Sequence, residues 1–190
     1  MVVFLVAPSL SRAASWDIDP VHTSVTFKVR HMMVSDVRGE FAKVSGKVDI
    51  DPKDAAKSSV DVTIDVASIN TRDAKRDGHL KSADFFDVAK FPNSTFKSTK
   101  VEAAGKGKLK VHGNLTMRGV SKLVVLEVEG PSPEVKGPWG SFHSGATATA
   151  KINRKDFGVS WNQALDAGGV VVGEEVTIFI DVELTRKASS

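Results

Sequence analysis

Apolar and polar residues alternate with a period of two along most of this chain. Residues 59–66 read S-V-D-V-T-I-D-V, so the apolar side chains share one face and the polar side chains share the other. The same alternation recurs in residues 23–31, 109–117, 120–128 and 176–184. A period of two indicates a strand with one buried face, whereas the 3.6-residue period of an amphipathic helix is scarce here. The pattern therefore predicts an all-β fold.

About eight long strands are predicted once three less regular segments, 37–50, 94–102 and 142–152, are added. The first of these segments changes parity between Phe41 and Val44, which indicates a bulge or a sharp bend. Arg118 and Gly119 mark a tight turn between two of the strands. Strands joined by tight turns favour an antiparallel meander, which closes into a barrel because closure removes exposed edges. The interior of an eight-stranded barrel is filled by side chains or holds one small ligand.

The alternation does not by itself say which face points inward. A transmembrane barrel alternates in the same way, with its apolar face toward lipid and aromatic girdles at both membrane interfaces. This chain has no Tyr and only three Trp, and Lys and Asp recur on its polar faces, as a water-exposed wall requires. We therefore expect an apolar interior, and Phe27, Val29 and His31, which share one face of a strand, are predicted to line it.

The composition and the absence of motifs narrow the function classes. The chain has no Cys, which excludes disulfides, thiolate catalysis and cysteine metal sites. It also lacks the glycine patterns of serine hydrolases, P-loops and dinucleotide-binding folds, so we predict no catalytic residues. The densest basic run, residues 106–110, has no aromatic neighbours on which bases could stack, so no nucleic-acid partner is expected.

The five His never occur at the short spacings that metal ligands adopt on one strand or helix. We therefore predict no metal site, although a zinc site assembled from His distant in the sequence stays open. No cofactor is expected either, apart from a bound lipid that a family resemblance implies below.

The first 14 residues predict the end of a signal peptide. An apolar run at residues 2–6 precedes small residues, and Ser11 and Ala13 stand three and one positions before a cleavage site of the signal-peptidase kind. The apolar run is short and no basic segment precedes it, which indicates a trimmed signal; a buried N-terminal strand is the alternative. We expect one exported domain at residues 15–187, which is an ordinary length for a single domain, and a tail at 188–190.

Met32 and Met33 stand between two predicted strands, where turns favour Gly, Asn or Asp. Flexible thioethers at this position either contact an irregular apolar partner or plug one end of the barrel. A second unusual stretch, R-D-G-H-L-K-S-A-D-F-F-D at residues 76–87, ends in the paired rings of Phe85 and Phe86. Either at least one of these rings contacts a ligand, or both seal the core beneath a loop.

Four stretches match the pattern of a known family: WDIDPVHTSVTFKVRHMMVSDVRGEF (16–41), SINTRDAKRDGHLKSADFFDVAKFPNSTF (68–96), GNLTMRGVSKLVVLEV (113–128) and NRKDFGVSW (153–161). In them the chain resembles the YceI family of bacterial lipocalin-like, polyisoprenoid-binding proteins. The central signature, R-D-x-H-L-x-S-x-D-F-F-D followed by F-P, is long and specific. A small departure is Met33, where the family often has Gly, and it bears on the shape of the local turn.

The resemblance implies an extended eight-stranded antiparallel lipocalin-like barrel with a short helix in the 73–86 region, exported to the periplasm. Its apolar tunnel would hold a polyprenyl chain or an isoprenoid quinone for carriage, storage or sequestration, without catalysis. The implied partners are this lipid, a membrane or membrane protein that gives or takes it, and a second copy in a homodimer. The candidate ligand-binding residues are Phe27, Val29, His31, Met32, Met33, Phe41, Phe85, Phe86, Met117, Phe157 and Trp161.

Two other functions are the alternatives. One is an enzyme or accessory factor of isoprenoid or quinone metabolism that uses the polar cluster Arg76, Asp77, His79 and Lys81. Alternating charges on a helix are, however, typical of a solvated face. The other is a scavenger of lipophilic antibiotics or fatty amides, which would need the same kind of apolar tunnel.

Overall fold

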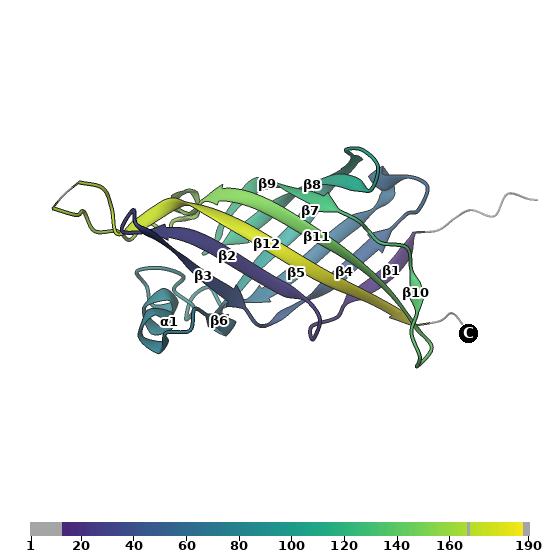
Figure 1. The fold of residues 1–190 in the computed structure, drawn as a ribbon, viewed down its shortest axis with the longest axis horizontal. Helices are drawn as coiled ribbons and strands as arrows, with labels where there is room; N and C mark the ends of the chain where they lie inside the picture. The colour runs from purple at the N-terminus through teal and green to yellow at the C-terminus, as the bar shows by residue number, and fades with distance from the viewer. Residues whose placement is uncertain (1–12, 167, 188–190) are drawn as a thin grey trace, which may run out of the picture.

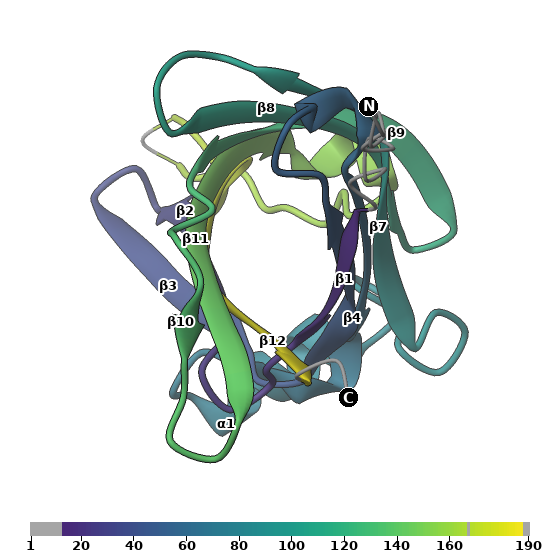
Figure 2. The same cartoon turned by 90° about the vertical axis from the view of Figure 1, so that its right-hand side faces the viewer.

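The strands of this chain wind into an elongated antiparallel barrel in a computed structural model that describes residues 13–166 and 168–187 (Figures 1 and 2). Residues 1–12 of the predicted signal peptide and the predicted tail at 188–190 lie outside the described residues. The strands are β1 (Ala14–Ile18), β2 (Ser24–His31), β3 (Ser35–Phe41), β4 (Val44–Ile50), β5 (Ser59–Asp65), β6 (Ile69–Asn70), β7 (Asn93–Ala103), β8 (Lys108–Met117), β9 (Val120–Glu129), β10 (Val135–Lys136), β11 (Ser141–Asn153) and β12 (Val172–Lys187). The helical turns are η1 (Ala55–Lys57), η2 (Val66–Ser68), α1 (Ala74–Lys81) and η3 (Arg154–Phe157).

Eight strands form the closed wall. Their order around the barrel is β11-β9-β8-β7-β5-β4-β1-β12, and β12 pairs again with β11 to close the ring. Every one of these pairings is antiparallel. The prediction of a closed eight-stranded antiparallel barrel with one short helix is therefore confirmed.

The long strand β12 joins two different neighbours on one of its sides. Its residues 172–181 pair with β2, whereas Leu184 and Thr185 pair with β1. On its other side β12 pairs with β11 from Glu175 to Lys187. The hairpin of β2 and β3 therefore extends the wall at the end of the barrel where α1 lies, and β1 completes the wall at the opposite end (Figure 1).

The segment predicted as one bent strand, residues 37–50, is in fact two strands. β3 ends at Phe41 and β4 begins at Val44, so the change of parity marks a turn between them. β3 pairs with β2 and β6, whereas β4 pairs with β1 and β5. β1 itself was not among the predicted strands, because the five-residue alternation around Trp16 and Ile18 is short and ends in a polar turn.

The segment that carries α1 lies beside one end of the barrel (Figure 1). Its helix begins after Asp73, whose carboxylate accepts the backbone N–H of Arg76 at 2.9 Å and so caps the first turn. The helix is eight residues long, and no helix in the described part of the chain is long and apolar enough to cross a membrane. Phe85 and Phe86 follow the helix in a run of turns.

Arg118 holds the segment after α1 against the barrel. It lies in the β8–β9 turn, which was predicted as a tight turn, and both Arg118 (φ 49°) and Gly119 (φ 75°) have the positive φ that a two-residue hairpin of type I′ requires. Its guanidinium donates hydrogen bonds to the carbonyls of Ala83, Phe85 and Gly158 at 2.7–2.9 Å. Three carbonyls from two loops therefore meet at one side chain.

Candidate ligand-binding tunnel

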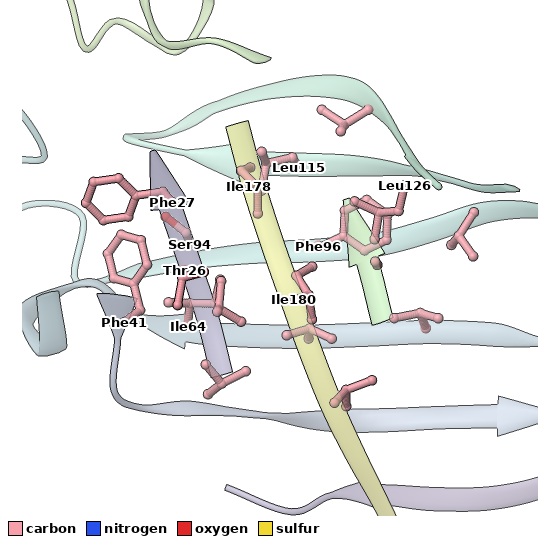
Figure 3. A pocket seen from close by; sticks show the side chains of 18 of the residues that line it. Thr26, Phe27, Phe41, Ile64, Ser94, Phe96, Leu115, Leu126, Ile178 and Ile180 are labelled. Carbon is pink, nitrogen blue, oxygen red and sulfur yellow. The ribbon is translucent and has the colours of Figure 1, made fainter. Parts of the chain in front are cut away.

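The interior of the barrel is an apolar tunnel with about 280 Å³ of space. Of the 39 residues that line it, 34 are apolar, and they come from the inward face of nearly every strand (Figure 3). Ala146 and Ala148 of β11 line it with small side chains. Binding pockets for small molecules are typically a few hundred Å³ and mostly apolar, so this tunnel has the character of a ligand site.

Few polar groups in the tunnel are free to bind a ligand. Five lining residues are polar: Thr23, Thr26, Ser58, Ser94 and Arg154. The hydroxyls of Thr23 and Thr26 donate to the carbonyls of their β12 neighbours, and the Ser58 hydroxyl accepts the N–H of Asp51. The lining contributed by the described residues contains no carboxylate, imidazole or amine. The tunnel therefore favours apolar contact over directed hydrogen bonding.

Arg154 is the charged residue in this lining, and it is only 5% exposed. Its guanidinium donates to three backbone carbonyls, those of Gly173 (2.8 Å), Val159 (2.6 Å) and Val172 (3.2 Å). Burial lowers the pKa of this guanidinium, which nevertheless stays charged because the ordinary pKa of Arg is so high. The three bonds tie η3 to the start of β12 and fix the wall at this end of the tunnel.

Aromatic rings surround the end of the tunnel nearest α1. Phe27, Phe41, Phe85 and Phe86 all line it. The Phe41 ring lies 5.8 Å from that of Phe27 and 5.9 Å, edge to face, from that of Phe86. Such spacings are favourable aromatic contacts, so the rings form a chain from β2 to the segment after α1.

Phe85 lines the tunnel and also packs against the rings of His79 and Trp161. Its ring lies 5.3 Å from Trp161 and 5.0 Å from His79, and His79 is in turn 5.0 Å from Trp161. His79 Nε2 lies 2.9 Å from the Asp84 carboxylate, which orients the imidazole. Trp161 and His79 therefore pack against the Phe85 ring without lining the tunnel themselves.

Near the end of the barrel opposite α1, Arg186 stacks with two aromatic rings. The guanidinium carbon lies 4.3 Å from the ring centre of Phe142 and 5.0 Å from that of Trp16. Nη2 of Arg186 lies 2.7 Å from Glu134, while its buried Nε has no hydrogen-bond partner. The two rings attract the guanidinium charge through cation–π contact, and Trp16 packs with Ile18 and Leu184, which line the tunnel, whereas Trp16, Phe142 and Arg186 do not line it.

The structure brings six of the eleven predicted site residues into the tunnel lining: Phe27, Val29, Phe41, Phe85, Phe86 and Met117. His31 does not line it, although it shares the parity of Phe27 and Val29, because it is the last residue of β2. Phe157 is 2% exposed, but it packs in η3 against the core residues around Phe96 and does not reach the tunnel. Whether the six residues bind a ligand remains a prediction.

Met32 and Met33, two of the predicted ligand-binding residues, form the exposed β2–β3 turn and are not part of the tunnel lining, which argues against the alternative that they plug the barrel. Both have positive φ (47° and 61°), and the N–H of Val34 bonds the carbonyl of His31 at 3.0 Å. Their exposed fractions are 44% and 54%. A type I′ turn favours Asn and Gly at these positions, and each side chain held there costs about 1–2 kcal/mol. The turn is therefore strained and presents two thioethers to solvent.

Sequence reasoning missed Arg154 as a lining residue. The signal was present, because Ala148, Ala150 and Ile152 are buried on one face of β11 and Arg154 continues their parity. A charged residue at an inward position indicates that the strand has ended. β11 does end at Asn153, but Arg154, the first residue of η3, is still part of the tunnel lining. Leu80 was also missed, since it reaches the tunnel from a helix in which no residue is fully buried.

The polar cluster near α1 serves local structure. Asp77 accepts both the N–H (2.8 Å) and the hydroxyl (2.6 Å) of Thr71, and Arg76 donates to the hydroxyl and carbonyl of the same Thr71 at 2.8 Å. Thr71 is 3% exposed, so these bonds anchor the start of the segment. Neither Arg76 nor Asp77, His79 or Lys81 lines the tunnel.

Comparison of the sequence with protein families places most of the chain in one family. A family model described as a YceI-like domain matches residues 16–184. A UPF0312 protein of Vibrio cholerae serotype O1 is 40% identical over 156 residues, which are 80% of this chain and 81% of that protein. A UPF0312 protein of Shewanella baltica is 40% identical over 157 residues, 82% of each chain.

Solved structures share the fold. The YceI protein of Campylobacter jejuni is 35% identical with a TM-score of 0.69, over 84% of this chain and 90% of that one. BcnA of Burkholderia cenocepacia is 28% identical with a TM-score of 0.74, over 87% and 98%. A domain of Saccharophagus degradans described as polyisoprenoid-binding has a TM-score of 0.63 over 90% and 98%, and at 17% identity this likeness concerns the fold alone.

Proposed function

The chain belongs to the YceI family, and on this premise we propose that it is a non-catalytic binding protein that holds an isoprenoid lipid in its barrel. The observation that carries the proposal is the tunnel lining, which is apolar at 34 of 39 residues. The lining offers no carboxylate, imidazole or amine among the described residues, and these are the groups that acid–base catalysis usually employs. The role we infer is to carry, store or sequester the lipid.

The energetics of burial support a long apolar ligand. Each methylene transferred from water to an apolar site contributes about 0.8 kcal/mol. Association costs roughly 4–15 kcal/mol in lost freedom, so a tail of a few isoprene units offsets this cost without strong recognition of its head group. A polyprenyl chain and the tail of an isoprenoid quinone meet this requirement equally, and we propose both as ligands.

Mass spectrometry of lipid extracted from the purified protein tests this proposal. The expected result is an unmodified isoprenoid lipid at up to one molecule per chain. A lipophilic antibiotic or a fatty amide in its place would support the scavenger, and chemical conversion of an added isoprenoid or quinone would support an enzyme. Either outcome would refute the proposed function.

Truncation of Phe86 tests where the lipid lies. Phe86 is half-buried, lines the tunnel and meets Phe41 edge to face. Phe86→Ala is expected to weaken lipid binding by about tenfold while lowering stability only modestly, because the lost ring contacts are mainly those to ligand. Lipid titration and thermal unfolding of delipidated protein measure the two effects separately.

Phe157→Ala is the matched control, because Phe157 is 2% exposed and does not line the tunnel. This variant should lose about 3–5 kcal/mol of stability and keep its lipid affinity when folded. If Phe86→Ala instead behaves like this control, Phe86 is a core residue and the lipid lies elsewhere in the tunnel.

We propose in addition that the protein is exported to the periplasm, because residues 1–14 have an apolar run followed by small residues before a cleavage site of the signal-peptidase kind. The exported protein is expected to begin at Ala14 or Ser15, next to the start of β1. N-terminal sequencing of protein from the periplasmic fraction checks this, and retention of Met1 would contradict it. A membrane, a membrane-protein donor or acceptor of lipid, and a homodimer remain predicted partners.

A further inference from the structure

Outside the tunnel, three metal-ligating side chains converge where the turn between β1 and β2 crosses β12. His22 Nδ1 lies 3.0 Å from Asp19 Oδ2 and 4.0 Å from Glu183 Oε2. One ligand atom from each of the three residues lies within 4.8 Å of the other two. We propose that Asp19, His22 and Glu183 bind one divalent transition-metal ion on the outer wall of the barrel, with water completing the coordination.

The spacing of the ligand atoms suits a tetrahedral ion. Zn²⁺ binds imidazole nitrogen and carboxylate oxygen at about 2.0–2.2 Å, so two of its ligand atoms stand about 3.3 Å apart. The observed 3.0 Å and 4.0 Å lie on either side of this value. Small rotations of the exposed His22 ring and of the partly buried Asp19 and Glu183 side chains are therefore sufficient to admit the ion. One imidazole and two carboxylates form a mixed nitrogen and oxygen set of the kind that Zn²⁺ accepts.

Backbone hydrogen bonds hold the three residues together without any ion. The N–H of Asp19 bonds the carbonyl of Glu183 at 2.9 Å. The hydroxyl of Thr23 lies 3.4 Å from the same carbonyl and accepts the N–H of Glu183 at 3.2 Å. Both ends of the turn are thus attached to one residue of β12, which lies 160 positions further along the chain. The site is preorganised because the fold places its ligands.

The carboxylate oxygens that face away from the site are also engaged. Oδ1 of Asp19 accepts the backbone N–H groups of Val21 (2.8 Å) and His22 (3.3 Å). Oε1 of Glu183 lies 2.8 Å from Nδ1 of His143, whose other ring nitrogen lies 2.7 Å from the hydroxyl of Ser141. Hydrogen-bond partners of this kind orient the ligands of metal sites and increase the affinity for the metal. Each carboxylate therefore has one oxygen fixed and the other directed toward His22.

Without a metal ion, Nδ1 of His22 and the Asp19 carboxylate share a hydrogen bond of 3.0 Å. The hydrogen bond to Asp19 raises the pKa of His22 and lowers that of Asp19. Other His in the chain also meet a carboxylate: His79 lies 2.9 Å from Asp84, and His112 lies 2.9 Å from Glu102. Among the described residues, only the group at Asp19, His22 and Glu183 brings a third ligand atom within reach. That third ligand distinguishes a metal site from an ion pair.

Calorimetric titration of the full, tag-free protein with ZnCl₂ in a non-chelating buffer tests the proposal. One Zn²⁺ per chain is expected, and His22→Ala, Asp19→Asn and Glu183→Gln should each weaken binding by about tenfold or more. His112→Ala is the matched control, because it removes an imidazole that has one carboxylate partner, and its affinity should stay within about twofold of the unaltered protein.

Thermal unfolding separates loss of the site from loss of the fold. The His22 ring is 62% exposed, so His22→Ala should unfold at the same temperature as the unaltered protein in EDTA. Added Zn²⁺ should raise the unfolding temperature of the unaltered protein and not that of His22→Ala, since an ion that binds only the native state stabilises it. Absence of saturable binding, or equal binding by His22→Ala, would overturn the proposal. Neither result bears on the lipid tunnel, which shares none of the three ligands.

Discussion

Replacement of Phe27 by Asp is expected to destabilise the protein by about 3 kcal/mol or more and to abolish lipid retention. The Phe27 ring lines the tunnel and packs against Phe41 at 5.8 Å. It also fills the space above Gly39, where an added Cβ would come within 2.5 Å of the ring. An Asp at this position removes these contacts and places an unpaired charge in an apolar interior, which is costly because no water solvates it.

Leu123→Asp is the control for this prediction, because it makes the same kind of change on the outer wall. Leu123 lies on β9 and is 65% exposed, so its replacement should change stability by no more than about 0.5 kcal/mol. Urea unfolding of delipidated protein and lipid extraction from the purified variants provide the two measurements. Equal stability and equal lipid retention of the two variants would show that the face assignment of β2 is wrong.

Replacement of Arg154 by Met is expected to cost about 3 kcal/mol or more and to release the loop that precedes β12. Three backbone carbonyls lose their donor in this variant. A hydrogen bond from a charged group contributes about 1.5–3 kcal/mol, and a buried carbonyl left without a donor carries a desolvation penalty. Removal of the buried charge of Arg154 also removes its desolvation cost, which offsets part of the lost hydrogen-bond energy. The three carbonyls nevertheless remain without a donor, so we expect a net loss of stability.

Two further variants define the cause of that loss. Arg154→Lys keeps the charge but cannot reach three carbonyls with a planar fork, so its stability should lie between those of Arg154→Met and the unaltered protein. Arg38→Met removes an exposed guanidinium that lies 5.9 Å from the ring centre of Phe179, and should change stability by no more than about 0.5 kcal/mol. If Arg154→Met is as stable as Arg38→Met, the three bonds do not hold the end of the barrel.

The barrel was predictable because each of its long strands carries a local signal. Residues 120–129 and 108–117 alternate cleanly, and the turn between them has the residues that a tight hairpin needs. β1 and β10 escaped prediction because they have five and two residues, too few for a period of two to be recognised. β1 has its place in the sheet through pairing with β4 and β12, which are distant in the sequence, whereas β10 pairs with β11, the next strand along the chain.

The tunnel lining was predictable in part, because alternation shows which residues of a long strand share one face. Phe27 and Val29 were identified because they share the apolar face of one strand and the composition indicated that this face points inward, and both line the tunnel. His31 has the same parity but does not line the tunnel. It is the last residue of β2, and it lies beside an irregularity in β12, where the register shifts between Val172 and Val176. Trp161 was drawn from a family signature, and only the fold shows that it lies behind Phe85 and not against the tunnel.

Alternation along single strands was therefore sufficient to predict an antiparallel barrel, since each side chain's face depends on its own strand, and the Lys and Asp of the polar faces with the scarcity of Trp and Tyr indicated that the apolar face points inward. The closure of β12 onto β11, the carbonyls that surround Arg154 and the meeting of His22 with Glu183 followed only from the assembled fold. These features join residues that local periodicity does not relate, up to 161 positions apart for His22 and Glu183. Their positions are set by strand register and barrel closure, which depend on the packing of all the strands at once.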